Sequence, residues 1–185
     1  MILYFYANNT HMHTLQNISF SHERALIRVD FNVPLDDNGN VTDDTRIVAA
    51  LSTIQYILEQ GGSCVLMSHL GRPKGNDIKL SLKQIVPTLE KHLGKAIHFC
   101  DEVVGSKASA QAAALAQGEV LLIENLRFHK GETKGDKDFS KALSELGTVY
   151  VNDAFGTAHR PHASTTAVAE FFPKKKCLNN FPPGA

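Results

Sequence analysis

The stretch Ala25-Leu-Ile-Arg-Val-Asp-Phe-Asn32 is an apolar run that ends in an acid and an amide. Three further apolar runs, at residues 64–67, 120–123 and 148–151, also lead into loops with charged or polar side chains. Short apolar, β-branched runs bounded by turn signals are typical of buried strands in a parallel sheet. These four runs therefore predict the centre of an α/β domain.

Helical periodicity fills the segments between these runs. Residues 43–60 carry apolar side chains at intervals of three and four, which predicts an amphipathic helix with Thr42 as its N-cap. Ser81 and Gln84 have the spacing of a capping box, which predicts the start of a second helix. Gly94 is expected to end that second helix.

Two more helices and one more strand complete the pattern. Residues 105–117 are rich in alanine, and residues 137–146 repeat apolar side chains with a helical period. Residues 96–99 fit a short strand between the second and third helices. The order β-α-β-α-β-α-β-α-β predicts an α/β fold, a Rossmann-like open parallel sheet with helices on both faces.

The sequence predicts one domain with an extension at each end. The alternation of strands and helices covers residues 15–172, which is long enough to bury a core without disulfide bonds. Residues 1–14 are expected to be an N-terminal extension, with Met12 as an alternative start. Residues 173–185 contain three prolines and no periodicity, so we expect a tail without secondary structure.

Composition excludes several classes of function. Lys+Arg and Asp+Glu are balanced at 19 each, so no overall basic field attracts nucleic acid or a membrane. No apolar stretch approaches the length of a transmembrane helix. The three cysteines have no CxxC spacing, which indicates a reducing environment. We therefore expect a cytoplasmic protein with no nucleic-acid or membrane partner. A monomer is expected as well.

Arginines gather where the predicted strands end. Ligands of open parallel sheets bind beyond the carboxyl ends of the strands. The chain has six arginines, and Arg72, Arg127 and Arg160 follow such ends. Arg46 opens the first predicted helix, close to the exit of the first strand. Several arginines converging on one edge predict a site for an anion with more than one charge.

Other side chains of this edge narrow the chemistry of the ligand. Asp30 cannot bind an anion, so we expect it to accept a hydrogen bond from a substrate hydroxyl, and Asn32 can likewise accept one through its amide. Gly71 and Gly75 are typical turn residues, but next to His69 and Arg72 they also permit close approach of the backbone to a phosphate. A small phosphorylated hydroxy acid satisfies the whole set. The alternative is structural: arginines near strand ends often form ion pairs within the protein, and Asp30 could merely cap a turn.

Metal and nucleotide sites are not predicted from the residues. His159 and His162 have the spacing of metal ligands, but Pro161 breaks the helix that would align them. The chain has no HExxH motif and no acidic cluster to complete a metal site. It also has no GxGxxG or GxxxxGK[ST] motif that could hold nucleotide phosphates.

Five segments resemble the amino-terminal domain of phosphoglycerate kinase, in the order and spacing of that family. They are residues 28–34, 44–47, 68–75, 122–128 and 151–160. The similarity extends over residues 15–172. It implies a glycolytic kinase that moves a phosphoryl group between 1,3-bisphosphoglycerate and ADP, or between ATP and 3-phosphoglycerate, with magnesium.

The resemblance also implies roles for single residues. Asp30 and Asn32 would hold the substrate's hydroxyl group. Arg46 would face the carboxyl group and the phosphoryl group in flight, as the catalytic residue. The substrate's phosphate would be held by His69, Arg72, Arg127 and Arg160.

The chain departs from the family pattern in three ways. The family's second domain, which carries the groups for Mg-ATP and Mg-ADP, has no counterpart in these residues. Residues 176–185 do not match the family, and Pro161 stands where the family usually has a small residue. A truncated gene, a frameshift or a deliberate fragment would each explain the ending. We expect the isolated chain to be inactive; the alternative function is a non-catalytic anion-binding module.

Overall fold

Parallel strands form one sheet in the computed structural model, which describes residues 15–154 and 161–179. The order across the sheet is β3-β4-β2-β1-β5-β6, and every neighbouring pair is parallel. The strands are β1 Arg24–Val29, β2 Ser63–Met67, β3 His98–Cys100, β4 Val120–Ile123, β5 Val149–Asp153 and β6 Cys177–Asn179.

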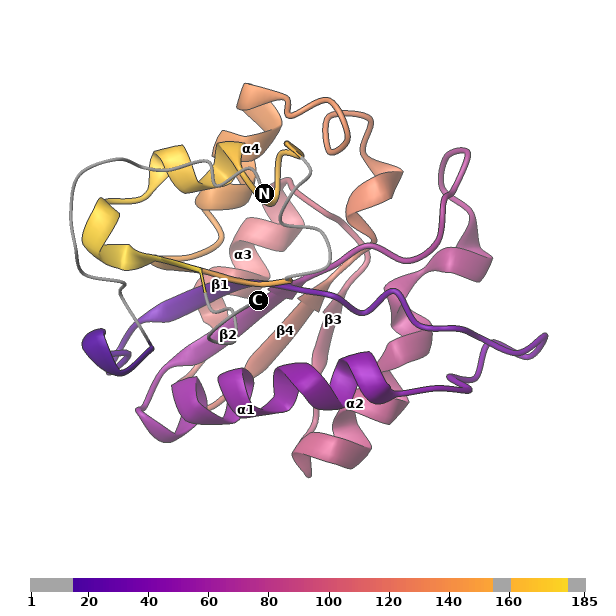
Figure 1. The fold of residues 1–185 in the computed structure, drawn as a ribbon, viewed down its shortest axis with the longest axis horizontal. Helices are drawn as coiled ribbons and strands as arrows, with labels where there is room; N and C mark the ends of the chain where they lie inside the picture. The colour runs from indigo at the N-terminus through magenta and orange to yellow at the C-terminus, as the bar shows by residue number, and fades with distance from the viewer. Residues whose placement is uncertain (1–14, 155–160, 180–185) are drawn as a thin grey trace, which may run out of the picture.

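Helices connect successive strands and cover both faces of the sheet. Figure 1 shows α1 and α2 on one side and α3 and α4 on the other. The predicted alternation and the α/β class are therefore confirmed. The α-helices are α1 Thr45–Glu59, α2 Val86–Leu93, α3 Ser106–Ala114 and α4 Lys137–Ser144. Short 3-10 helices are η1 Leu15–Asn17, η2 Ile78–Leu80, η3 Leu82–Ile85, η4 Leu126–Phe128, η6 Ala167–Phe171 and η7 Lys174–Lys176.

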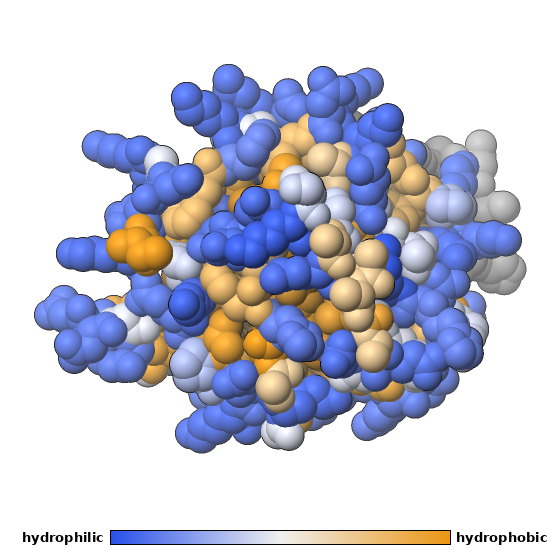
Figure 2. Space-filling view, turned by 180° about the vertical axis from the view of Figure 1, so that it is seen from behind, coloured by the Kyte–Doolittle hydropathy of each residue, from blue (hydrophilic) through white to orange (hydrophobic). Residues whose placement is uncertain are grey.

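Two apolar cores lie on the two faces of the sheet. Ile27 of β1 packs in the first core with Ile54 of α1, whereas its neighbour Leu26 packs in the second core with Leu143 of α4. Successive side chains of a strand point to opposite faces, so both must be apolar when both faces are covered. This explains the unbroken apolar runs of the sequence. Figure 2 shows hydrophilic side chains around the periphery of one face, with apolar ones gathered toward its middle.

The segment expected to be a structureless tail contains a strand. β6 pairs with β5 in parallel, and Leu178 is buried beside it. Lys176 also forms an ion pair of 2.7 Å with Glu23, ahead of β1. The expectation that no element follows Pro173 is therefore wrong. Three residues are too few to show an alternation, and adjacent lysines and prolines conceal the apolar pair Cys-Leu.

The predicted caps are only partly correct. Thr42 is not the N-cap of α1; Asp44 precedes the helix, and Asp43 accepts the Thr45 N–H at 2.9 Å. Ser81 caps the 3-10 helix η3 instead of an α-helix, and its expected capping-box partner Gln84 donates to carbonyls of η2. The Ser81 hydroxyl instead donates to Glu124 at 2.6 Å, a long-range contact that local spacing does not encode.

Candidate functional site

The carboxyl ends of β1, β2 and β5 lie level with one another. Arg28 is in register with Met67 of β2, and Val29 is in register with Asp153 of β5. The loops that follow are joined, since the Phe31 N–H donates to the Ser68 hydroxyl at 2.9 Å. The sheet therefore brings the loops that follow β1 and β2, which carry Asp30, Asn32, His69 and Arg72, to one edge.

Asp30 and Arg46 meet at this edge. The Arg46 guanidinium donates to Asp30 Oδ2 at 2.6 Å, which joins the exit of β1 to the first turn of α1. The Arg46 side chain is 52% exposed and that of Asp30 is 18% exposed. Ion pairs that open to water contribute about 0–1 kcal/mol to stability. Arg46 can therefore exchange this partner for a ligand anion at little cost.

Asn32 and Arg127 hold the turn at Gly71 from two sides. Asn32 Oδ1 accepts the Gly71 N–H at 2.8 Å, while Arg127 donates to the Gly71 carbonyl. Gly71 has a φ of 63°, in the left-handed region that favours glycine, and a Cβ there would lie 2.8 Å from Leu80. The structure thus brings Asn32 and Arg127 together on the backbone that precedes Arg72.

Arg72 follows this turn and is exposed. It lines a shallow hollow with residues 73–77 and Leu80. The hollow lies along the loop that leads to η2. Arg72 is therefore an exposed residue beside the fixed turn.

Glu124 and Asn125 brace the loops behind the edge, and sequence reasoning assigned them no role. Asn125 accepts the Leu70 N–H at 3.3 Å and donates to the carbonyls of Leu70 and Leu80, each at 2.8 Å. Glu124 accepts the Leu82 N–H at 2.9 Å. Both residues are buried, so these hydrogen bonds replace the hydrogen bonds to water that their polar groups lose on folding. Their position inside a family-like segment was the only signal.

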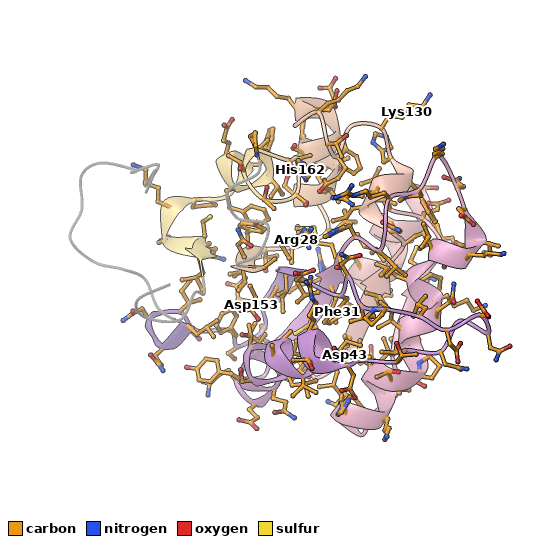
Figure 3. The ribbon with its side chains drawn as sticks, turned by 45° about the vertical axis from the view of Figure 1, so that its right-hand side comes forward. Arg28, Phe31, Asp43, Lys130, Asp153 and His162 are labelled. Carbon is orange, nitrogen blue, oxygen red and sulfur yellow. The ribbon has the colours of Figure 1, made fainter. Side chains whose placement is uncertain are left out.

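His69 is buried against Arg28, and Arg28 is a third residue to which the sequence assigned no role. Arg28 Nη2 lies 3.1 Å from His69 Nδ1, and Arg28 Nε donates to the Ser164 hydroxyl at 2.9 Å. Burial lowers the pKa of Arg28, against the opposing effect of the Glu132 carboxylate. Figure 3 shows Arg28 in the interior, between Phe31 on the α1 side and His162 on the α4 side.

Arg160, the remaining predicted site residue, lies outside the described residues, as does His159. His162 is described, and its Nδ1 is 3.8 Å from Glu132. Within residues 15–154 and 161–179, no group of three His, Cys, Asp or Glu side chains is placed to hold a metal ion. No helix in this part of the chain is both long and apolar enough to cross a membrane.

The fold and this edge define an open parallel α/β domain whose strand ends carry cationic and hydrogen-bonding side chains. The family model described as phosphoglycerate kinase matches residues 15–178. The chain belongs to the phosphoglycerate kinase family. The match includes η7 and most of β6, beyond the limit of similarity expected from the motifs.

Relatives and solved structures agree with this assignment. A phosphoglycerate kinase of Moorella thermoacetica is 53% identical over 161 residues, which are 86% of this chain and 41% of that protein. "Phosphoglycerate kinase 3, cytosolic" of Arabidopsis thaliana is 51% identical over 158 residues, 85% of this chain and 39% of that protein.

The fold also matches structures of the family. Phosphoglycerate kinase from Coxiella burnetii superimposes with a TM-score of 0.80 and 35% identity, over 93% of this chain and 42% of that one. Phosphoglycerate kinase from Pyrococcus horikoshii superimposes with a TM-score of 0.83 and 31% sequence identity. This match covers 92% of this chain and 42% of that one. The chain therefore spans about two fifths of the length of these relatives.

Proposed function

We propose that this chain is the part of a phosphoglycerate kinase that binds 3-phosphoglycerate and 1,3-bisphosphoglycerate. The observation that carries the proposal is the meeting of family motifs around one edge of the sheet. Asp30 meets Arg46 there, and Asn32 and Arg127 share the turn that precedes Arg72. A small acid with a hydroxyl group and a phosphate matches these side chains in charge and in hydrogen bonding.

Asp30 and Asn32 would bind the hydroxyl group of this acid. The Asp30 carboxylate would accept a hydrogen bond from the hydroxyl group. Asn32 Oδ1 already accepts the Gly71 N–H, so its Nδ2 group is the better placed partner, as a donor to the hydroxyl oxygen. This reverses the direction of the hydrogen bond that the sequence suggested for Asn32.

Arg46 would carry the catalytic contribution of this chain. The acceptor carboxylate is ionised at neutral pH, so the transfer requires no general base. Phosphoryl transfer depends on positioning and on neutralising the charge spread over the equatorial oxygens. Arg46 is permanently cationic and half-exposed, and its exposed ion pair with Asp30 can open when the acid arrives. The phosphate of the acid would be bound by His69, Arg72, Arg127 and Arg160.

Mg-ATP and Mg-ADP are part of the family's reaction, but the described residues do not fit them. They hold no cluster of metal ligands, and the sequence has no glycine-rich phosphate motif. We further propose that the chain is a monomer in the cytoplasm, in keeping with the relative named as cytosolic.

Calorimetric titration of the chain with 3-phosphoglycerate tests the proposed function. Arg72→Ala should weaken binding by roughly 1.5–3 kcal/mol, the contribution of a hydrogen bond to a charged group. Arg24→Lys is the matched control, because Arg24 donates to the Leu146 carbonyl at the amino end of β1, away from the site. Equal affinities of Arg72→Ala and the unaltered chain would contradict the role of Arg72, and no binding at all would refute the proposal.

A further inference from the structure

Arg28 is a fully buried arginine within the central sheet. Only 1% of its surface is exposed, and its guanidinium donates to the Val29 carbonyl, to Ser164 and toward His69. Buried arginines are rare because removing the charge from water costs several kcal/mol. Arg28 is too deeply buried to belong to the proposed binding surface. Its partners show what the buried charge does.

Arg28 and its partners form a network of hydrogen bonds in which the donor and the acceptor of each bond can be assigned. The Glu132 carboxylate is buried and can only accept, so the Ser164 hydroxyl donates its one proton to Glu132 Oε1 at 2.6 Å. The lone pairs of the same hydroxyl then accept Arg28 Nε at 2.9 Å. The Ser164 N–H also donates to Glu132 Oε2 at 3.1 Å, and the Tyr150 hydroxyl donates to the Ser164 carbonyl at 2.8 Å. Ser164 is thereby fixed.

The same direction applies to His69. An arginine has five donors and no acceptor, so a contact of 3.1 Å between Arg28 Nη2 and His69 Nδ1 requires Nδ1 to accept. A proton on Nδ1 would place the N–H of His69 against the N–H of Arg28, with no acceptor between them. The neutral ring must therefore carry its proton on Nε2, which leaves Nε2–H as the donor of the imidazole.

We propose that Arg28 is a positioning residue, which holds His69 as the neutral tautomer protonated on Nε2. The hydrogen bonds from Glu132 through Ser164 to Arg28 fix this tautomer of His69 before any ligand binds. The benefit to phosphate binding rests on the proposed function, in which His69 meets the phosphate of the acid. The positive charge at the phosphate then comes from the arginines, while His69 supplies one oriented N–H.

Nuclear magnetic resonance of the whole chain, with ¹⁵N-labelled histidine and no ligand, tests the proposal directly. Long-range ¹H–¹⁵N spectra at neutral pH should show His69 with Nδ1 unprotonated and Nε2 protonated. Arg28→Met removes the donors at similar length and should give a mixture of tautomers. Protonation of Nδ1 in the unaltered chain would overturn the proposal, as would an unchanged tautomer in folded Arg28→Met.

Ser164→Ala tests the same chain of bonds without removing the buried charge, in case Arg28→Met does not fold. It removes the acceptor of Arg28 Nε and should also mix the tautomers of His69. Ser140→Ala is the matched control, because Ser140 is fully buried but donates to the Asp136 carbonyl at 2.7 Å. This bond is not part of the hydrogen-bond network of Arg28. Identical His69 spectra for both serine variants would contradict the proposal.

Titration with 3-phosphoglycerate separates this proposal from the proposed function. Ser164→Ala should bind about five-fold more weakly than Ser140→Ala, which corresponds to one hydrogen bond of roughly 1 kcal/mol. A fixed Nε2–H tautomer in a chain that does not bind the acid would refute the proposed function and support the role of Arg28. A mixed tautomer in an unaltered chain that does bind would refute the role of Arg28 alone.

Discussion

Some side chains at the strand ends bond to the backbone of neighbouring loops, and others are exposed to solvent. Asn32 and Arg127 each hold the backbone of Gly71, whereas Arg72 is exposed beyond it. The sequence predicted which residue types gather there, because their positions after apolar runs are visible. It could not predict the buried contact between Arg28 and His69, since these residues are 41 positions apart and their pairing depends on the sheet.

Arg46→Ala separates ligand binding from stability at the residue scale. The exposed pair with Asp30 contributes about 0–1 kcal/mol, so the midpoint of urea unfolding should hardly change. Binding of 3-phosphoglycerate should weaken by roughly 1.5–3 kcal/mol, because a charge-assisted contact is lost. Arg46→Lys keeps the charge, so its affinity for 3-phosphoglycerate should lie between those of the unaltered chain and Arg46→Ala. A large loss of stability without loss of affinity would show that Arg46 is structural.

The reactivity of the thiols is a second residue-scale prediction. Burial raises the pKa of Cys177 to about 11 and also raises the pKa of Cys64 and Cys100. Since the thiolate is the reactive form, a disulfide reagent at pH 7.5 should modify all three slowly in the native chain and rapidly in urea. Rapid modification of Cys177 in the native chain would show that β6 is not docked.

At the scale of elements, the strong periodicities were predictive and the short elements were not. The α/β alternation follows from apolar runs and helical repeats that span many residues. β6 has three residues, and η3 replaces the predicted start of α2 because Ser81 bonds to Glu124 from a distant loop. Element boundaries set by such tertiary contacts are not encoded in local spacing.

Leu178→Ala tests whether β6 belongs to the domain. Leu178 is 1% exposed in the first core, so truncation should lower the free energy of unfolding by about 2–5 kcal/mol, as for other buried leucines. Ile78→Ala is the control, because Ile78 is 77% exposed and should change stability by less than about 0.5 kcal/mol. Equal denaturation curves for both variants would support the tail that the sequence predicted.

At the scale of the whole molecule, the proposed site would hold one of the two reactants of a phosphoryl transfer, the acid. Positioning both reactants in line can be worth roughly 7–11 kcal/mol. A coupled assay with ATP and 3-phosphoglycerate should therefore give background rates for the purified chain. Turnover that persists after purification and disappears in Arg46→Ala would contradict this expectation and reveal a nucleotide site within these 185 residues.

Amide chemical shifts report where on the sheet the acid binds. Titration of ¹⁵N-labelled chain with 3-phosphoglycerate should shift the amides of Asp30, Asn32, His69, Gly71 and Arg72, which lie at the carboxyl ends of β1 and β2. Inorganic phosphate should shift fewer of these amides, because it has no hydroxyl-bearing carbon chain to reach Asp30. Shifts confined to the opposite edge of the sheet, or no shifts at saturating acid, would contradict the account.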